Sequence, residues 1–187
     1  MKYNERDKME LLDINVELKN ASKQITEEQI DQFIETIDEH KRIFVYGTGR
    51  SGLMLKALAM RLMQIGYQSY VVGETTTPSI EKGDLLIVSS ASGETQSVCT
   101  AADDGVKQGV DVLVITGSQE STLSRNHEPL IQIEAANKFS ESKASIQPLG
   151  SLFEQMLLMI FDAVILKMSK KNEDTNKKMA KRHASIE

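Results

Sequence analysis

The chain has 187 residues, of which 40% are hydrophobic and 26% are charged, and it carries a net charge of -5 at pH 7. This length and composition exclude a fibrous or disordered protein and favour one soluble domain with a sizeable core. The acidic balance argues against an overall positive field that attracts nucleic acid, and the single cysteine, Cys99, excludes an intramolecular disulfide. We therefore expect one domain over residues 1–187, with N-terminal helices over 1–40, an α/β core over 41–170 and a C-terminal tail over 171–187.

The first forty residues have the periodicity of two helices. The second is expected to begin at Thr26, because Thr26 and Gln29 have the spacing of a capping box. Phe33, Ile34 and Ile37 follow at helical spacing. They form the apolar stripe of this predicted helix.

Five short apolar runs come next, and most of them are continuous rather than alternating. Continuous runs are typical of strands buried on both faces, as in a parallel sheet. The predicted strands are residues 42–46, 69–72, 84–89, 111–116 and 129–133. Helix-length segments over 51–64, 95–108 and 121–126 separate several of them. The alternation predicts right-handed crossovers and a three-layer α/β/α sandwich around a five-stranded parallel sheet.

The connection between the second and third strands is shorter than the others. Thr77 as a cap and Pro78 at the first helical position predict a single helical turn over residues 79–83.

The stretch after the last predicted strand, residues 134–150, has little periodicity and is longer than most loops in compact domains. Such length favours a functional loop, placed at the edge of the sheet where ligands are expected. A strongly apolar helix is predicted over 151–168, and a polar segment over 172–182 follows it. The N-terminal residues 1–7 are too charged for a signal peptide, and Asp162 interrupts the apolar run that precedes it, so we expect a cytoplasmic protein.

Two glycine-containing loops follow predicted strands and precede predicted helices. They are Gly47-Thr48-Gly49-Arg50-Ser51 and Ser90-Ala91-Ser92-Gly93-Glu94-Thr95. Backbone amides at a helix start, together with the hydroxyls of Ser51, Ser90, Ser92 and Thr95, can hold a phosphate group. The glycines at 47, 49 and 93 allow the backbone to approach the ligand closely. Both loops leave the carboxyl ends of strands, so we expect them to hold one phosphorylated ligand from two sides.

The first loop also fits a dinucleotide-binding fingerprint, since Gly47, Gly49 and Gly52 satisfy G-x-G-x-x-G and Glu74 follows the second strand. A dinucleotide site does not require the hydroxyls of the second loop, and 187 residues leave little room for a separate substrate domain. A purely structural role of both loops, as tight turns, is the remaining alternative.

Glu154 is the most informative ionisable residue, because it lies one turn into the apolar helix that follows the long loop. Ser151 and Glu154 also have the S-x-x-E spacing of a capping box, which is a structural alternative. His40 and His127 are interpreted as surface or C-capping residues. His183 lies near the C-terminus, where it could reach a neighbouring site. No histidine and carboxylate spacing typical of a metal site is apparent, so no metal is expected.

The two loops resemble those of the sugar isomerase (SIS) domain family. Three further stretches resemble the branch of this family that acts on hexulose phosphates: residues 71–78 (VVGETTTP), 147–154 (QPLGSLFE) and Arg182-His183-Ala184. The similarity covers essentially the whole chain and implies a flavodoxin-like sheet. Ala91 departs from the pattern, since a glycine is common at this position in the family.

The resemblance implies interconversion of D-arabino-hex-3-ulose 6-phosphate and D-fructose 6-phosphate, a step of formaldehyde assimilation through the ribulose monophosphate pathway. It further implies a homotetramer, no cofactor, and neither a nucleic-acid nor a membrane partner. Moving a carbonyl from C3 to C2 needs a base at C2, an enediol or enediolate intermediate, and proton return at C3. The resemblance assigns the base to Glu154 and lets His183 of an adjacent subunit transfer hydroxyl protons. The phosphate would bind Gly47, Gly49, Ser51 and residues 90–95.

Two other functions are compatible with the loops. An aldose-ketose isomerase of the arabinose 5-phosphate type would share them and differ in its substrate. A sugar-phosphate sensor in a transcription regulator would need a DNA-binding segment, but residues 1–42 carry seven basic against eleven acidic side chains.

Overall fold

The computed structural model of the chain describes residues 9–134, 145–171 and 175–185. Five parallel strands form one sheet in the order β2-β1-β3-β4-β5. They are β1 (Arg42–Tyr46), β2 (Gln68–Val71), β3 (Leu85–Ser90), β4 (Asp111–Thr116) and β5 (Pro129–Gln132). Every predicted strand is therefore present, and no bound differs from its prediction by more than one residue.

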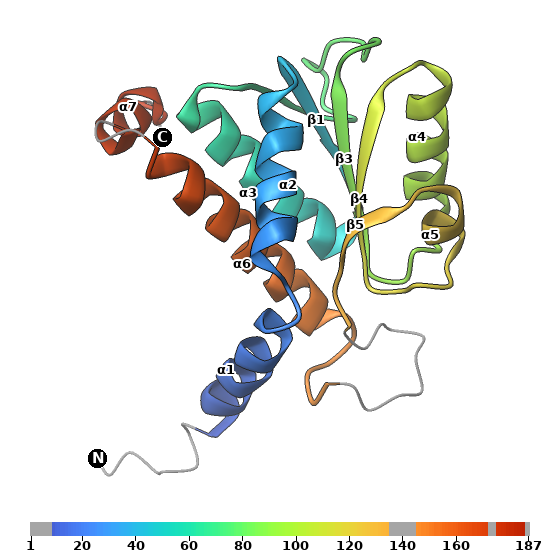
Figure 1. The fold of residues 1–187 in the computed structure, drawn as a ribbon, viewed down its shortest axis with the longest axis vertical. Helices are drawn as coiled ribbons and strands as arrows, with labels where there is room; N and C mark the ends of the chain where they lie inside the picture. The colour runs from blue at the N-terminus through green and yellow to red at the C-terminus, as the bar shows by residue number, and fades with distance from the viewer. Residues whose placement is uncertain (1–8, 135–144, 172–174, 186–187) are drawn as a thin grey trace.

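Helices cover both faces of the sheet, which confirms the three-layer sandwich (Figure 1). One face carries α2 (Glu27–Asp38), α3 (Gly49–Ile65) and α6 (Ser151–Ser169), and the other carries α4 (Gln96–Lys107) and α5 (Thr122–Asn126). Successive side chains of β3 point alternately into two hydrophobic cores, one on each face of the sheet. Ile87 packs in the core on the α3 and α6 face, whereas Val88 packs in the core on the α4 face.

The remaining helices, α1 (Met9–Ser22) and α7 (Thr175–Arg182), lie outside the three layers. The polar composition of residues 172–182 did not predict α7. Arg182 of this helix donates to the carbonyl oxygens of Gln64 (3.1 Å) and Ile65 (3.2 Å) at the end of α3. This tertiary contact satisfies carbonyls that a helix leaves unpaired. None of the helices in the described ranges is long and apolar enough to cross a membrane.

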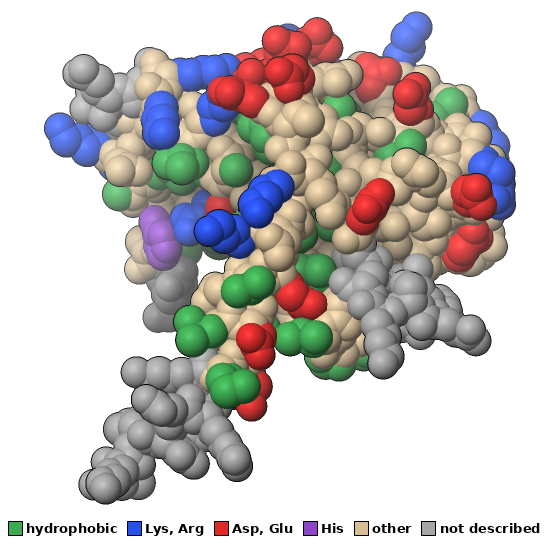
Figure 2. All heavy atoms as spheres, turned by 60° about the horizontal axis from the view of Figure 1, so that its bottom comes forward, with side chains coloured by type: hydrophobic (Ala, Val, Ile, Leu, Met, Phe, Trp, Pro, Cys, Tyr) green, Lys and Arg blue, Asp and Glu red, His purple; other side chains and the backbone are tan. Residues whose placement is uncertain are grey.

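Helix α1 projects from the body of the molecule and exposes apolar side chains (Figures 1 and 2). Met9, Leu12 and Val16 are each more than half exposed, and their spacing of three and four residues puts them on one face of the helix. Ala21, by contrast, is buried in the core. The outward face of α1 thus has the composition of a buried surface.

The predicted helical turn at residues 79–83 is wrong, because residues 75–84 contain turns and irregular backbone and no helix. The hydroxyl of Thr77 donates to the carbonyl oxygen of Val71 at 2.5 Å. It is therefore engaged at the end of β2 and does not cap a helix.

The strand order places a reversal between β1 and β3. From β1 the chain proceeds through α3 to β2 on one side, whereas β3, β4 and β5 extend the sheet on the other side. In open α/β sheets, ligands bind at the carboxyl ends of the strands at such a reversal. Both glycine-containing loops leave these two strands, as β1 ends at Tyr46 and β3 ends at Ser90.

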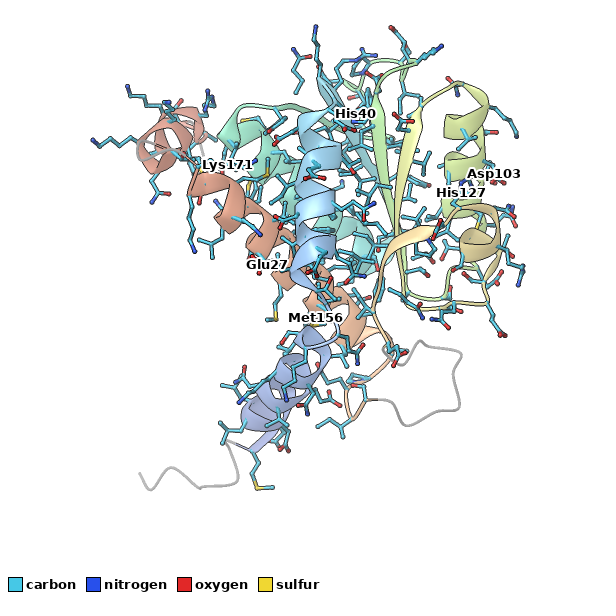
Figure 3. The ribbon with its side chains drawn as sticks, in the orientation of Figure 1. Glu27, His40, Asp103, His127, Met156 and Lys171 are labelled. Carbon is cyan, nitrogen blue, oxygen red and sulfur yellow. The ribbon has the colours of Figure 1, made fainter. Side chains whose placement is uncertain are left out.

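His40 is a buried link between α2 and the sheet at the opposite edge (Figure 3). Its two ring nitrogens contact the carbonyl oxygen of Thr36 (2.6 Å) and the carboxylate of Asp111 (2.9 Å). Of the two predicted positions, surface or C-capping, the contact with Thr36 is that of a C-capping residue, and the side chain is buried. His127 is the C-cap of α5, as predicted, and its ring contacts Asp103 at 2.8 Å (Figure 3).

The His40 link should make folding stability depend on pH. Burial would lower the pKa of His40, but the acceptors at Thr36 and Asp111 outweigh burial and raise this pKa above its usual value. Both partners are acceptors, so both ring nitrogens donate only when the ring is protonated. The stabilising contribution is therefore complete below the unfolded-state pKa of about 6.5 and is lost as the pH rises through the folded-state value.

We expect His40→Gln to lower the free energy of unfolding by about 1 kcal/mol more at pH 5.5 than at pH 9. Urea unfolding at the two pH values measures the difference. Asp111→Asn is the control, because it keeps the Thr36 contact and should reduce the same pH dependence. Equal losses from His40→Gln at both pH values would contradict the expectation.

Candidate active site

The two loops and the start of α6 enclose a cavity of about 150 Å³ at the β1 and β3 carboxyl ends. Its lining consists of residues 48–51, residues 89–92, Thr95, Gly150 and Glu154. The predicted phosphate-binding hydroxyls of Ser51, Ser90, Ser92 and Thr95 thus lie around one cavity, together with the predicted base. Gly47 lies beside a second cavity, and neither Gly93 nor Glu94 is part of the lining.

Three helices begin at this cavity, and none of the three has a side-chain cap within the described part of the chain. The N-cap residues are Thr48 for α3, Thr95 for α4 and Gly150 for α6. By contrast, side chains of Thr26 and Ser121 cap α2 and α5, which begin elsewhere. Backbone amides in a first helical turn lack intrahelical partners and favour a negative charge. Three uncapped helix starts around one cavity are therefore suited to an anion.

The first loop reaches its position because two glycines pack against each other. A Cβ atom on Gly52 would lie 2.4 Å from the carbonyl oxygen of Gly47, and one on Gly47 would lie 2.7 Å from Leu55 Cδ1. Gly49 has a φ of +57°, in the left-handed region that favours glycine. The glycine pattern therefore brings the start of α3 close to the end of β1.

The second loop is ordered by its own hydroxyl groups. The Ser90 and Thr95 hydroxyls lie 3.0 Å apart, and Ser90 Oγ also accepts from the amide of Gly93 at 3.1 Å. Ser92 Oγ accepts from the amide of Glu94 at 3.2 Å. These contacts orient the loop, and the hydroxyl of Ser51 adds a donor from α3 at the same cavity.

Glu94 points away from the cavity lining and supports the start of α5. Its carboxylate accepts from the amide of Thr122 (2.8 Å) and from the Thr122 hydroxyl (2.7 Å). These two donors lower the pKa of Glu94. The geometry thus gives Glu94 a supporting position in the second loop.

Glu154 lies at the cavity beside Arg50. Arg50 Nη1 is 3.2 Å from Glu154 Oε2, and the Glu154 side chain is 18% exposed. The capping box that was the structural alternative for Glu154 is not formed, because α6 begins at Ser151 with Gly150 as its N-cap, and Ser151 Oγ donates to the carbonyl oxygen of Pro148. The carboxylate of Glu154 is therefore oriented toward the cavity and the first loop. Arg50 of the first loop thus adds positive charge to the site.

The tail residue His183 does not line this cavity within its own chain. It follows α7, is exposed, and its backbone amide donates to the carbonyl oxygen of Ala180. Of the predicted functional loop, residues 135–144 lie outside the described residues. Its end, Gly150, lies at the cavity.

Ser89 belongs to the cavity and was missed by sequence analysis. It is the penultimate residue of β3 and is 1% exposed. Its hydroxyl has no hydrogen-bond partner among the described residues. The sequence carries one indication, a serine after the four apolar residues 85–88, but a serine at a strand end does not by itself indicate a binding site.

In the dinucleotide-binding alternative, the carboxylate of Glu74 would bind the ribose of the dinucleotide. In the structure, Glu74 pairs with Lys56 at 2.7 Å beside a second cavity of about 430 Å³ on the β2 side of Gly47. Within the described ranges, no group of three His, Cys, Asp or Glu side chains is arranged to hold a metal ion.

Comparison with known families gives a match over most of the chain. The model of the SIS domain family matches residues 36–166. This range contains both loops and the first four turns of α6, including Glu154.

Relatives extend the similarity over nearly the full length. A 3-hexulose-6-phosphate isomerase of Bacillus subtilis is 41% identical over 174 residues, covering 91% of this chain and 94% of the relative. One from Mycobacterium gastri is 37% identical over 172 residues, covering 91% and 86%. A solved structure from Methanococcus jannaschii, for which the function of 3-hexulose-6-phosphate isomerase was inferred, has a TM-score of 0.79 and 33% identity and covers 95% of this chain and 99% of its own.

Proposed function

The chain belongs to the SIS domain family, and we propose that it is an isomerase that interconverts 3-hexulose 6-phosphate and fructose 6-phosphate. Relatives with this name at 41% and 37% identity support the substrate. The observation that carries the reaction type is the position of Glu154 in a cavity onto which three uncapped helix starts open.

The phosphate of the substrate binds where α3 and α4 begin. The hydroxyls of Ser51, Ser90, Ser92 and Thr95 and the free amides of the first turns supply donors. The glycines of both loops and the small side chain of Ala91 in the second loop allow the backbone to approach the anion closely. Because the phosphate group is on C6, its binding holds C2 and C3 of the substrate beside the carboxylate of Glu154. The reacting atoms are thereby held in a fixed relative position, which lowers the entropic cost of the reaction.

Glu154 performs the proton transfer at carbon. Its carboxylate removes the proton from C2, the C2–C3 enediolate forms as the C3 carbonyl gains electron density, and the same carboxyl returns a proton to C3. The proton of the C2 hydroxyl moves to the oxygen on C3. The reaction is an internal redox change, so it needs no external cofactor. Arg50 places a positive charge beside the base and the developing enediolate.

A direct assay tests this proposal. Incubation with 3-hexulose 6-phosphate in deuterated water should give fructose 6-phosphate with solvent deuterium at the carbon that receives the proton. Arabinose 5-phosphate is the parallel substrate, and its preferred conversion would replace the hexulose assignment by an aldose-ketose isomerase. Binding without conversion or exchange of any of these sugars would favour the sensor.

We place the reaction in the cytoplasm, within formaldehyde assimilation through the ribulose monophosphate pathway. We further propose a homotetramer in which His183 of an adjacent subunit transfers hydroxyl protons. Exposed apolar residues on α1 and on α6, such as Leu158 and Leu166, support self-association. Glu17 of α1 also accepts from the amide of Ile146 and the side chain of Gln147, just before α6 begins. Helix α1 therefore contacts the segment that precedes α6, the helix that carries Glu154.

Light scattering should give a mass of four chains of 20.8 kDa each. We expect Val16→Glu to give smaller species and, because His183 would lose its neighbour, to lower kcat at least tenfold. Val106→Glu is a matched control, since Val106 is 52% exposed on α4 where Val16 is 57% exposed on α1. Equal masses for both variants and wild type would contradict a role of α1 in assembly. A monomeric wild type would contradict the tetramer itself.

A further inference from the structure

Ser89 has a buried hydroxyl for which the described residues offer no hydrogen-bond partner. Its side chain is almost fully buried, yet Oγ finds no partner among the described residues. Buried hydroxyl groups in native proteins nearly always have a hydrogen-bond partner, because burial removes them from water. The other such atom in the described residues, Gln155 Oε1, is not in the cavity lining, whereas Ser89 is.

The pleat of β3 determines which side of the sheet Ser89 faces. Leu85 and Ile87 pack in the core with α3 and α6, and Leu86 and Val88 pack in the core with α4. Side chains alternate along a strand, so Ser89 faces α3 and α6. These helices contribute Ser51 and Glu154 to the same cavity.

Ser90 faces the opposite way and has different surroundings. Its hydroxyl is engaged by Thr95 at the start of α4 and by the amide of Gly93. The adjacent serines therefore serve different parts of the cavity. Ser90 is engaged at the start of α4, whereas Ser89 faces the side of the cavity that carries Ser51 and Glu154.

From this placement we infer that the Ser89 hydroxyl donates a hydrogen bond to a substrate oxygen on C2 or C3, the oxygen that becomes negative in the enediolate. The inference rests on the proposed isomerase function and adds a residue to it. A donor fixed in advance at a developing negative charge stabilises the transition state more than the bound substrate. The lack of a partner for this hydroxyl among the described residues is then a consequence of its role, since its acceptor arrives with the substrate.

The test compares Ser89→Ala with wild type in four measurements: kcat, KM, inhibition by inorganic phosphate, and Tm. We expect kcat to fall about 10²-fold with KM changed by less than about threefold. Inhibition by phosphate should be unchanged, because the inferred contact of Ser89 is with an oxygen on C2 or C3 and not with the phosphate group. The Tm should be equal or higher, because an unsatisfied buried group is removed. Ser89→Cys, with a weaker donor of similar size, should give an intermediate kcat.

Ser69→Ala is the matched control. Ser69 Oγ donates to the carbonyl oxygen of Ala59 at 2.6 Å, outside the cavity, so its loss should lower Tm and leave kcat unchanged. An unchanged kcat in Ser89→Ala, a parallel loss of phosphate inhibition, or a Tm below wild type would each overturn the inference. A wild type that converts no 3-hexulose 6-phosphate would contradict the proposed function instead, and the wild-type assay therefore separates the two failures.

Discussion

Glu154→Gln is expected to lower kcat by about 10³-fold while substrate binding persists. The amide keeps the size of the side chain and loses the ability to accept a proton from carbon. The ion pair with Arg50, which is 47% exposed, contributes little to folding, so Tm should change only slightly. Steady-state kinetics, solvent deuterium incorporation and thermal unfolding measure the three effects.

Glu74→Gln provides the control for Glu154→Gln. Glu74 also lies at the carboxyl edge of the sheet and is also paired with a basic residue, Lys56, but it lies beside the other cavity. Its replacement should leave kcat within about twofold. Near-normal turnover and deuterium exchange in Glu154→Gln would remove Glu154 from the mechanism.

Gly93→Ala is expected to lower the free energy of unfolding by about 3 kcal/mol or more and to abolish most activity. Gly93 has a φ of +64°, and a Cβ atom there would lie 2.4 Å from the Cβ and 1.9 Å from the Oγ of Ser121, the cap of α5. The Cβ of Ser121 cannot rotate away, so the second loop must shift. The amide contact between Gly93 and Ser90 would then be lost with it.

Gly49→Ala distinguishes the cost of a left-handed backbone from the cost of a steric collision such as that of Gly93→Ala with Ser121. Gly49 has a φ of +57°, yet a Cβ atom there would have no neighbour within 4 Å. We expect this variant to lose only about 1 kcal/mol, the cost of a left-handed backbone for alanine. Urea unfolding of both variants gives the comparison, and equal losses would contradict the argued collision with Ser121.

The arrangement of the layers could be predicted from local patterns. Continuous apolar runs such as 84–89 are typical of strands covered on both faces, and that inference requires no knowledge of distant contacts. The same holds for the capping box at Thr26 and Gln29, which the structure contains. Loops that leave neighbouring parallel strands must meet at one edge, so the sequence also predicted that Ser51 and Thr95 would share a cavity.

Local patterns are insufficient where a tertiary contact competes with them. Ser151 and Glu154 have the spacing of a capping box, but Pro148 accepts the serine hydroxyl and Arg50 contacts the carboxylate. Helix α7 has few apolar residues of its own, and Arg182 attaches it to the end of α3. Arg50 and Glu154 are more than a hundred residues apart in the chain, and so are Arg182 and Gln64. A pattern within a short segment of sequence cannot predict such contacts.

By itself, the sequence determined the parallel sheet, the two glycine-containing loops and the candidate base, because periodicity, glycine positions and residue chemistry are local properties. Only the tertiary structure decided which side chains face one another. The reversal between β1 and β3 brings three helix starts without a side-chain cap among the described residues to one cavity. The pleat of β3 puts Ser89 on the face of the sheet that carries α3 and α6, and Ser90 on the other face, where its hydroxyl contacts Thr95. A shift of one residue along a strand exchanges its two faces, so the role of a buried serine depends on packing.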